Sequence, residues 1–134
     1  MAIDKTLKVL VVEDNTNLRK VLVNILTKVG FQSLQEAEDG AKGWEIVQKG
    51  EVGLVLTDWS MPVMSGLDLV MKIRSAPAPV KNLPILMITA LDTKNSVMEA
   101  AKHGVDAYII KPFSVQTIVT KIEEAIAKRA GAPA

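Results

Sequence analysis

Residues 52–57 read VGLVLT and are followed directly by Asp58. A continuous apolar run of this length, rich in β-branched residues, is typical of a strand that is buried on both faces of its sheet. Such strands occur mainly in parallel sheets, because helices cover both faces of those sheets. The run therefore predicts a central strand of a parallel sheet, with a carboxylate at its end.

Two further apolar runs precede this one and two follow it, and helical segments separate them. The other predicted strands are residues 7–12, 33–37, 84–89 and 107–110, of which 33–37 has the charged ends of an edge strand. Apolar residues at three- and four-residue spacing predict helices whose periodic residues span 18–29, 41–49, 67–74, 94–102 and 115–128. Asn15 can cap the first helix and Gly30 ends it, while Pro77 and Pro79 end the third.

The strict alternation of strands and helices predicts an α/β fold with helices on both faces of one sheet. Five strand–helix units in 134 residues are too few for an eight-stranded barrel. We therefore expect a five-stranded parallel sheet in the flavodoxin-like order 2-1-3-4-5. A single domain should fill residues 1–134, with its core at about 7–128 and flexible termini.

The composition excludes several kinds of function. Sixteen basic and 15 acidic residues give a net charge of +1, which argues against nucleic-acid binding through a basic face. The chain has no cysteine, so disulfides and thiolate catalysis are excluded. No apolar run reaches the roughly 18 residues of a membrane span, and the first residues lack the apolar core of a signal peptide. We expect a monomeric cytoplasmic protein that binds neither nucleic acid nor membrane.

The residues at the ends of the predicted strands suggest where the chemistry lies. Open parallel sheets bind ligands outside the carboxyl ends of their strands, beside the first strand. Glu13, Asp14, Asp58, Thr89 and Lys111 all end or follow strands that would be neighbours in this order. Each residue taken singly has an ordinary explanation as a cap, turn or strand-end residue. Together they predict a site with three carboxylates, a hydroxyl and an ammonium group.

Three adjacent carboxylates call for a cation. Two unit charges about 5 Å apart repel by roughly 3 kcal/mol at an effective dielectric constant near 20. A hard divalent cation removes this repulsion, and Mg²⁺ suits a site with few carboxylates because it keeps some of its water. Lys111 can hold a phosphoryl group as a point charge. A carboxylate can also act as the nucleophile, and Asp58 is the expected acceptor because it ends the central strand.

Four segments carry a resemblance to a known family. VVED (11–14), LTDWSMPVMSGLDL (56–69), LMITA (86–90) and YIIKPF (108–113) occur in this order. The pattern resembles the response-regulator receiver domain over roughly residues 7–128, and within that family it is most similar to the single-domain chemotaxis regulators. The resemblance implies a phosphoprotein of a two-component signalling system, which is a switch and not an enzyme.

The resemblance also implies roles for residues of the site. Asp58 would accept a phosphoryl group from a histidine kinase or from a small acyl phosphate. Mg²⁺, or Mn²⁺ in its place, would be bound by Asp14, Asp58 and the backbone carbonyl of Ser60, with Glu13 acting through water. Ser60 and Leu91 occupy the positions that tune how long the phosphoryl group persists. Because Leu91 is apolar where the chemotaxis regulators carry an acid, we expect a longer phosphoryl lifetime.

The expected output is a change in protein–protein contacts. Thr89 and Lys111 would bind the phosphoryl group, and Tyr108 would turn inward as Thr89 moves. The partner surface implied by the resemblance is formed by the fourth helix, fifth strand and fifth helix, and includes Lys94, Val97, Tyr108 and Lys121. Its partner would be a flagellar motor switch or another motility component. A role as an intermediate carrier in a phosphorelay stays open.

Other functions of similar folds fit the sequence less well. A hydrolase with an aspartyl-phosphate intermediate would need a second acid two residues after the nucleophile, where this chain has Ser60. A receiver-like interaction module that is never phosphorylated should have lost some of the site residues, yet all are present. A flavin-binding protein would need a phosphate-binding loop after the first strand, and Glu13 and Asp14 would repel that phosphate.

Overall fold

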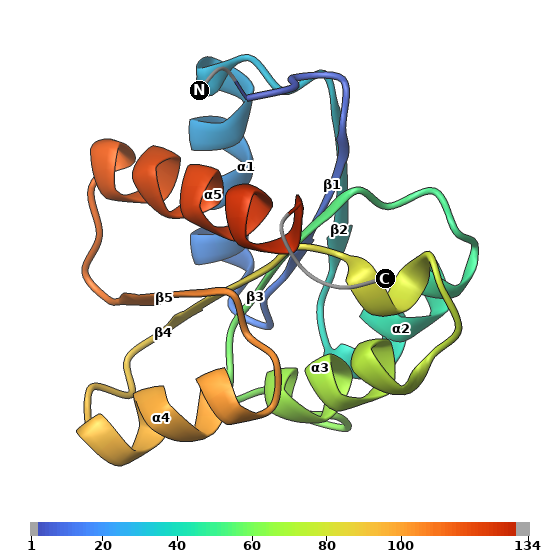
Figure 1. The fold of residues 1–134 in the computed structure, drawn as a ribbon. Helices are drawn as coiled ribbons and strands as arrows, with labels where there is room; N and C mark the ends of the chain where they lie inside the picture. Colours follow the sequence, from blue (N-terminus) through green and yellow to red (C-terminus); the bar gives the residue numbers. More distant parts are fainter. Residues whose placement is uncertain (1–2, 131–134) are drawn as a thin grey trace.

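The computed structural model describes residues 3–130, which form one parallel sheet with helices on both faces (Figure 1). The elements are β1 (Lys8–Val12), α1 (Thr16–Val29), β2 (Ser33–Ala37), α2 (Gly40–Gln48), β3 (Leu54–Thr57), α3 (Gly66–Ser75), the short 3₁₀ helix η1 (Val80–Asn82), β4 (Ile85–Thr89), α4 (Lys94–Lys102), β5 (Ala107–Ile110) and α5 (Val115–Ala130). The strand order is β2-β1-β3-β4-β5, and every neighbouring pair is parallel. The predicted fold class and strand order are confirmed.

Alternate residues of each inner strand enter two separate cores. In β1, Val9 and Val11 pack in the core beneath α1 and α5, whereas Leu10 and Val12 pack in the core beneath α2, α3 and α4. Figure 1 shows these two groups of helices on opposite sides of the sheet. Burial of both sets explains why the strands read as continuous apolar runs instead of alternating ones.

The ends of several elements differ from those expected, β3 for example beginning at Leu54 and not at residue 52, and some of the differences have a local cause. β4 begins at Ile85 and not at residue 84, because Pro84 has no N–H to donate to the ladder. α3 begins one residue early, at Gly66, where the Ser65 hydroxyl accepts a hydrogen bond from the Asp68 N–H at 3.1 Å. η1 follows the prolines that end α3 and was not expected.

The last helix is longer than the sequence suggested. α5 continues to Ala130, two residues beyond the expected end, and its last turn is held by an ion pair of 2.7 Å between Arg129 and Asp106. The flexible ends that we expected lie largely outside the described residues, which leave out 1–2 and 131–134. Within residues 3–130, no helix is both long and apolar enough to cross a bilayer.

Candidate phosphoryl-acceptor site

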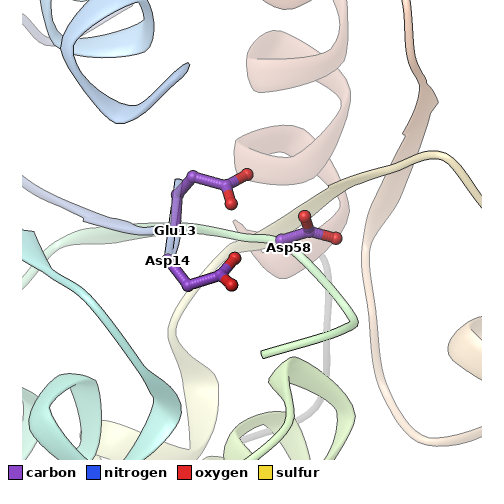
Figure 2. Close-up of side chains that lie close together, drawn as sticks. All are labelled: Glu13, Asp14 and Asp58. Carbon is purple, nitrogen blue, oxygen red and sulfur yellow. The ribbon is translucent and has the colours of Figure 1, made fainter. Parts of the chain in front are cut away.

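The carboxyl ends of the strands bring the expected acidic residues together. Glu13 and Asp14 follow β1 directly, and Asp58 follows β3, the neighbour of β1 in the sheet. One oxygen from each of the three carboxylates lies within 4.8 Å of the others. In Figure 2, the side chains of Glu13 and Asp14 both point toward the side on which Asp58 lies. The all-oxygen donor set fits a hard divalent cation such as Mg²⁺.

The three carboxylates differ in their exposure to solvent. Glu13 is 2% exposed and Asp58 is 8% exposed, whereas Asp14 lies at the surface. Burial raises the pKa of Glu13 to about 7, and the charge of Asp58 adds to this effect, while Lys111 opposes it. A cation bound beside these carboxylates would offset the cost of burying their negative charge.

Lys111 is the cation of the site. Its ammonium group donates to Asp58 Oδ2 at 2.8 Å and to Glu13 Oε1 at 3.2 Å. Burial acts to lower the pKa of Lys111, but the hydrogen bonds and charges of Asp58 and Glu13 outweigh it and hold that pKa above its ordinary value. Lys111 is thus charged at neutral pH and lies within hydrogen-bonding distance of the expected acceptor.

The main chain around Asp58 is held at several points. The Asp58 N–H donates to the Val12 carbonyl at 3.1 Å, and the Thr57 hydroxyl donates to the Asp58 carbonyl at 2.9 Å. Gly66 packs directly against this carbonyl, because a Cβ at position 66 would lie 1.7 Å from the Asp58 oxygen. The Trp59 N–H donates to Asp58 Oδ1 at 2.6 Å, which fixes the side chain as well.

Thr89, Leu91 and Tyr108 are connected through the loop after β4. Thr89 is 2% exposed at the end of β4, and its hydroxyl accepts a hydrogen bond from the Leu91 N–H at 3.3 Å. The Tyr108 hydroxyl donates to the Leu91 carbonyl at 2.9 Å. Leu91 is exposed, and so is Ser60, two residues after Asp58 in the chain. The loop after β4 therefore connects Thr89, which is expected to bind the phosphoryl group, with Tyr108, which is expected to change position when it does.

The surface expected to bind a partner contains a groove. A cavity of about 340 Å³ lies between α4, β5 and α5, and its lining includes Val97, Tyr108 and Lys121. The lining also includes Ala101, Ile110, Glu124 and Lys128. Lys94 is exposed at the start of α4 and is not part of this lining. Three of the four residues expected on the partner surface thus share one groove.

Sequence reasoning missed one residue of the site. Arg19, in the first turn of α1, donates to the backbone carbonyl of Glu13 at 2.7 Å. The residue type gives no sign of this contact, because a charged residue at the start of a helix is ordinarily exposed. Only its position six residues after Glu13, one turn into the helix, would have placed it near this edge of the sheet.

The fold and the site define the class of this protein. The family model of the response regulator receiver domain matches residues 9–123, and the chain belongs to this family. It is 41% identical over 122 residues to the chemotaxis protein CheY-3 of Vibrio cholerae, covering 91% of this chain and 93% of that protein. It is also 40% identical over 126 residues to the chemotaxis protein CheY homolog of Campylobacter jejuni, covering 93% of this chain and 96% of that protein.

A solved structure supports the same relationship. The CheX–CheY–BeF3–Mg complex of Borrelia burgdorferi contains a chain that superposes with a TM-score of 0.83 at 25% identity, covering 90% of this chain and 89% of that one. The predicted family is therefore confirmed by both sequence and structure.

Proposed function

We propose that this receiver domain is a chemotaxis response regulator that accepts a phosphoryl group on Asp58. The observation that carries the proposal is the contact of the Lys111 ammonium group with Asp58 Oδ2 at 2.8 Å, where one oxygen each of Asp58, Glu13 and Asp14 lies within 4.8 Å of the others. The relatives named as chemotaxis proteins support the biological role.

The residues present fit a magnesium ion. Asp14, Asp58 and the backbone carbonyl of Ser60 would hold it, with Glu13 acting through water, and Mn²⁺ would be an acceptable substitute. The ion would supply positive charge next to the phosphoryl oxygens. Glu13 and Asp58 are mostly buried, so their attraction for a cation is weakly screened by solvent.

Phosphoryl transfer at this site would use residues that are already in place. A carboxylate oxygen of Asp58 forms a bond to phosphorus while the bond from phosphorus to the donor's imidazole nitrogen breaks, and the imidazole takes up a proton. Lys111 would then pair with the phosphoryl oxygens, and the Thr89 hydroxyl would donate to one of them. The donor we propose is a histidine kinase; a small acyl phosphate would also serve. The protein is a switch and not an enzyme acting on a separate substrate.

The output would be read at the groove between α4, β5 and α5. The Thr89 hydroxyl accepts from the Leu91 N–H and the Tyr108 hydroxyl donates to the Leu91 carbonyl, so movement of Thr89 toward a phosphoryl group would disturb both bonds. A dianionic group at Asp58 would in this way change the groove that Tyr108 lines. The proposed partner is a flagellar motor switch or another motility component, bound by a monomer.

Intact mass measurement tests the proposal. We expect acetyl phosphate to add one phosphoryl group to the wild-type protein in the presence of Mg²⁺ but not in the presence of a chelator. Asp58→Ala should gain none under either condition. A wild-type protein that gains no mass with Mg²⁺ would contradict the proposal and favour an interaction module that is never phosphorylated.

A further inference from the structure

Arg19 joins the acidic site to the neighbouring edge of the sheet. Its Nη1 donates to the backbone carbonyl of Glu13 at 2.7 Å, and its Nε donates to Glu36 Oε1 at 3.0 Å. Glu36 belongs to β2, the edge strand, which pairs with β1. The Arg19 side chain is only 12% exposed. One guanidinium group therefore bridges the main chain of the site and a carboxylate on the next strand.

The place of this cation in α1 calls for a specific reason. A positive charge in the first turn of a helix opposes the helix dipole, and no acidic residue in that turn offsets it. Neutralising Glu36 is not a sufficient reason, since Lys20 already pairs with its other oxygen at 3.1 Å. Arg19 differs from Lys20 in that it also donates to the Glu13 carbonyl. Two donors pointing to two separate acceptors suit the fixed fork of a guanidinium group.

The Glu13 carbonyl lies in the peptide plane that leads to Asp14. Because this plane is rigid, fixing the carbonyl also fixes the start of Asp14. The Glu13 N–H donates to the Ala37 carbonyl at 3.0 Å, and the Asn15 N–H donates to Glu13 Oε2 at 3.1 Å, so Glu13 is held on both sides. Asp14, in contrast, is exposed, and its direction depends on the main chain that carries it.

We propose that Arg19 is a positioning residue of the metal site, which holds the Glu13–Asp14 peptide so that the Asp14 carboxylate faces Asp58. The proposal rests on the proposed function, because it assumes that these carboxylates bind a divalent cation. Glu36 keeps the guanidinium group in place. Burial acts against the charged form of Glu36, but hydrogen bonds from Lys20 and Arg19 outweigh it and hold its pKa below the ordinary value.

The sign of a change in Mg²⁺ affinity separates positioning from simple electrostatics. Arg19→Met and Lys20→Met each remove one positive charge from the same helix, and both residues pair with Glu36. Charge alone would make both variants bind Mg²⁺ more tightly. Positioning predicts that Arg19→Met binds Mg²⁺ roughly tenfold more weakly, as is usual when a residue supporting a metal ligand is lost. Lys20→Met should bind as well as the wild type or slightly better.

Trp59, next to Asp58, provides the signal for the titration. Its fluorescence can be followed during Mg²⁺ addition in a Trp44→Phe background, which removes the second tryptophan. Hydrogen exchange of the amides of residues 13–15, measured without metal, gives an independent reading. We expect faster exchange there in Arg19→Met than in Lys20→Met. An Arg19→Met protein with wild-type or tighter Mg²⁺ affinity would overturn the proposal.

If circular dichroism shows that Arg19→Met does not fold, Arg19→Lys provides the test instead. It keeps the charge and the stem but cannot bridge both acceptors, so it should bind Mg²⁺ more weakly than the wild type. Wild-type affinity in this variant would then overturn the proposal. Failure of the proposed function gives a different result, because the wild-type protein itself would not respond to Mg²⁺. In that case the metal-free exchange still shows whether Arg19 holds residues 13–15.

Discussion

Two regions at opposite ends of the sheet contain buried carboxylates bonded to cations, and they are built differently. At the amino ends of β4 and β5, Asp106 Oδ1 accepts from Arg129 Nε at 2.7 Å. Its Oδ2 accepts from Arg74 Nη2 and from the Ile85 N–H, both at 2.9 Å. We call Arg74, Asp106 and Arg129 the Asp106 cluster. At the carboxyl ends of the strands, the single ammonium group of Lys111 faces Asp58 and Glu13, with Asp14 beside them.

The difference lies in how far the protein offsets its own charge. In the Asp106 cluster two guanidinium groups surround one carboxylate, and Arg74 also donates to the backbone carbonyls of Lys81, Leu83 and Gly104. At the acidic site Lys111 is, among residues 3–130, the one cationic side chain bonded to the three carboxylates, and the pKa of Glu13 rises to about 7. The first arrangement is complete without a ligand and stabilises the fold. The second would need an external cation to offset its charge, as the proposed function requires.

Breaking the Asp106 cluster should have the largest effect on stability. Asp106→Asn leaves two poorly exposed guanidinium groups without their charge partner, so we expect the free energy of unfolding to fall by about 3 kcal/mol. Urea denaturation measures this. Mg²⁺ affinity should stay the same, because the cluster lies at the other end of the sheet. Glu51→Gln, which breaks an exposed ion pair with Lys8, is the control and should leave stability unchanged. A loss in Asp106→Asn no larger than in this control would contradict the comparison.

Neutralising Glu13 should have the opposite effect and raise the free energy of unfolding at alkaline pH. Its folded-state pKa is about 7 against an ordinary value of 4.5, so the unfolded chain releases this proton first as the pH rises. Wild-type stability should therefore fall between about pH 4.5 and pH 7, and Glu13→Gln should lack this fall. At pH 8 without Mg²⁺ we expect the variant to be more stable by about 1–3 kcal/mol, with little difference at pH 4. Urea denaturation across this pH range would exclude the account if the variant were less stable at pH 8.

The hydrogen bond from Tyr108 to the loop after β4 should contribute less to stability than the Asp106 cluster does. Tyr108→Phe removes the hydroxyl that donates to the Leu91 carbonyl, and we expect a loss of about 1 kcal/mol in the unphosphorylated protein. If this bond is exchanged during switching, the loss should be smaller after phosphorylation. Thermal unfolding with and without acetyl phosphate and Mg²⁺ gives both values. An equal loss in both states would separate Tyr108 from the switch.

The smallest effect concerns the lifetime of the phosphoryl group. Leu91 is exposed in the loop after β4, and the resemblance to the family implies that an acid there helps water to reach the acyl phosphate. We expect Leu91→Glu to lose its phosphoryl group severalfold faster than the wild type, as read by the decay of the phosphorylated mass after the donor is removed. Leu91→Gln is the matched uncharged control. Faster loss in the wild type than in Leu91→Glu would refute the expected role of this position.

The residues of the acidic site could be predicted from the sequence because each of them ends or closely follows a predicted strand. A parallel strand places the residue after it at a known edge, so Asp14, Asp58 and Lys111 could be brought together without coordinates. The Asp106 cluster was not predicted, since its ion pairs join residues 32 and 23 positions apart on different elements. The contact of Arg19 with the Glu13 carbonyl was missed for a related reason: a backbone acceptor leaves no mark in the sequence.

Element ends were predicted less well than element order. Pro84 and the Ser65 cap moved the starts of β4 and α3, and the Arg129–Asp106 pair extended α5. The residues expected on the partner surface stay a prediction, and three of the four line the groove. Val97 and Lys121 line the groove because α4 and α5 flank β5, whereas Lys94 sits on the first turn of α4 outside that lining.

The most direct test of the central claim is to find which carboxylate receives the phosphoryl group. Borohydride reduces an acyl phosphate of aspartate to homoserine, and peptide mass spectrometry then identifies the position. After treatment with acetyl phosphate and Mg²⁺, we predict homoserine at position 58 alone, and none when a chelator replaces Mg²⁺. Homoserine at position 14, or its absence from every position in the presence of Mg²⁺, would contradict the account of Asp58 as the acceptor.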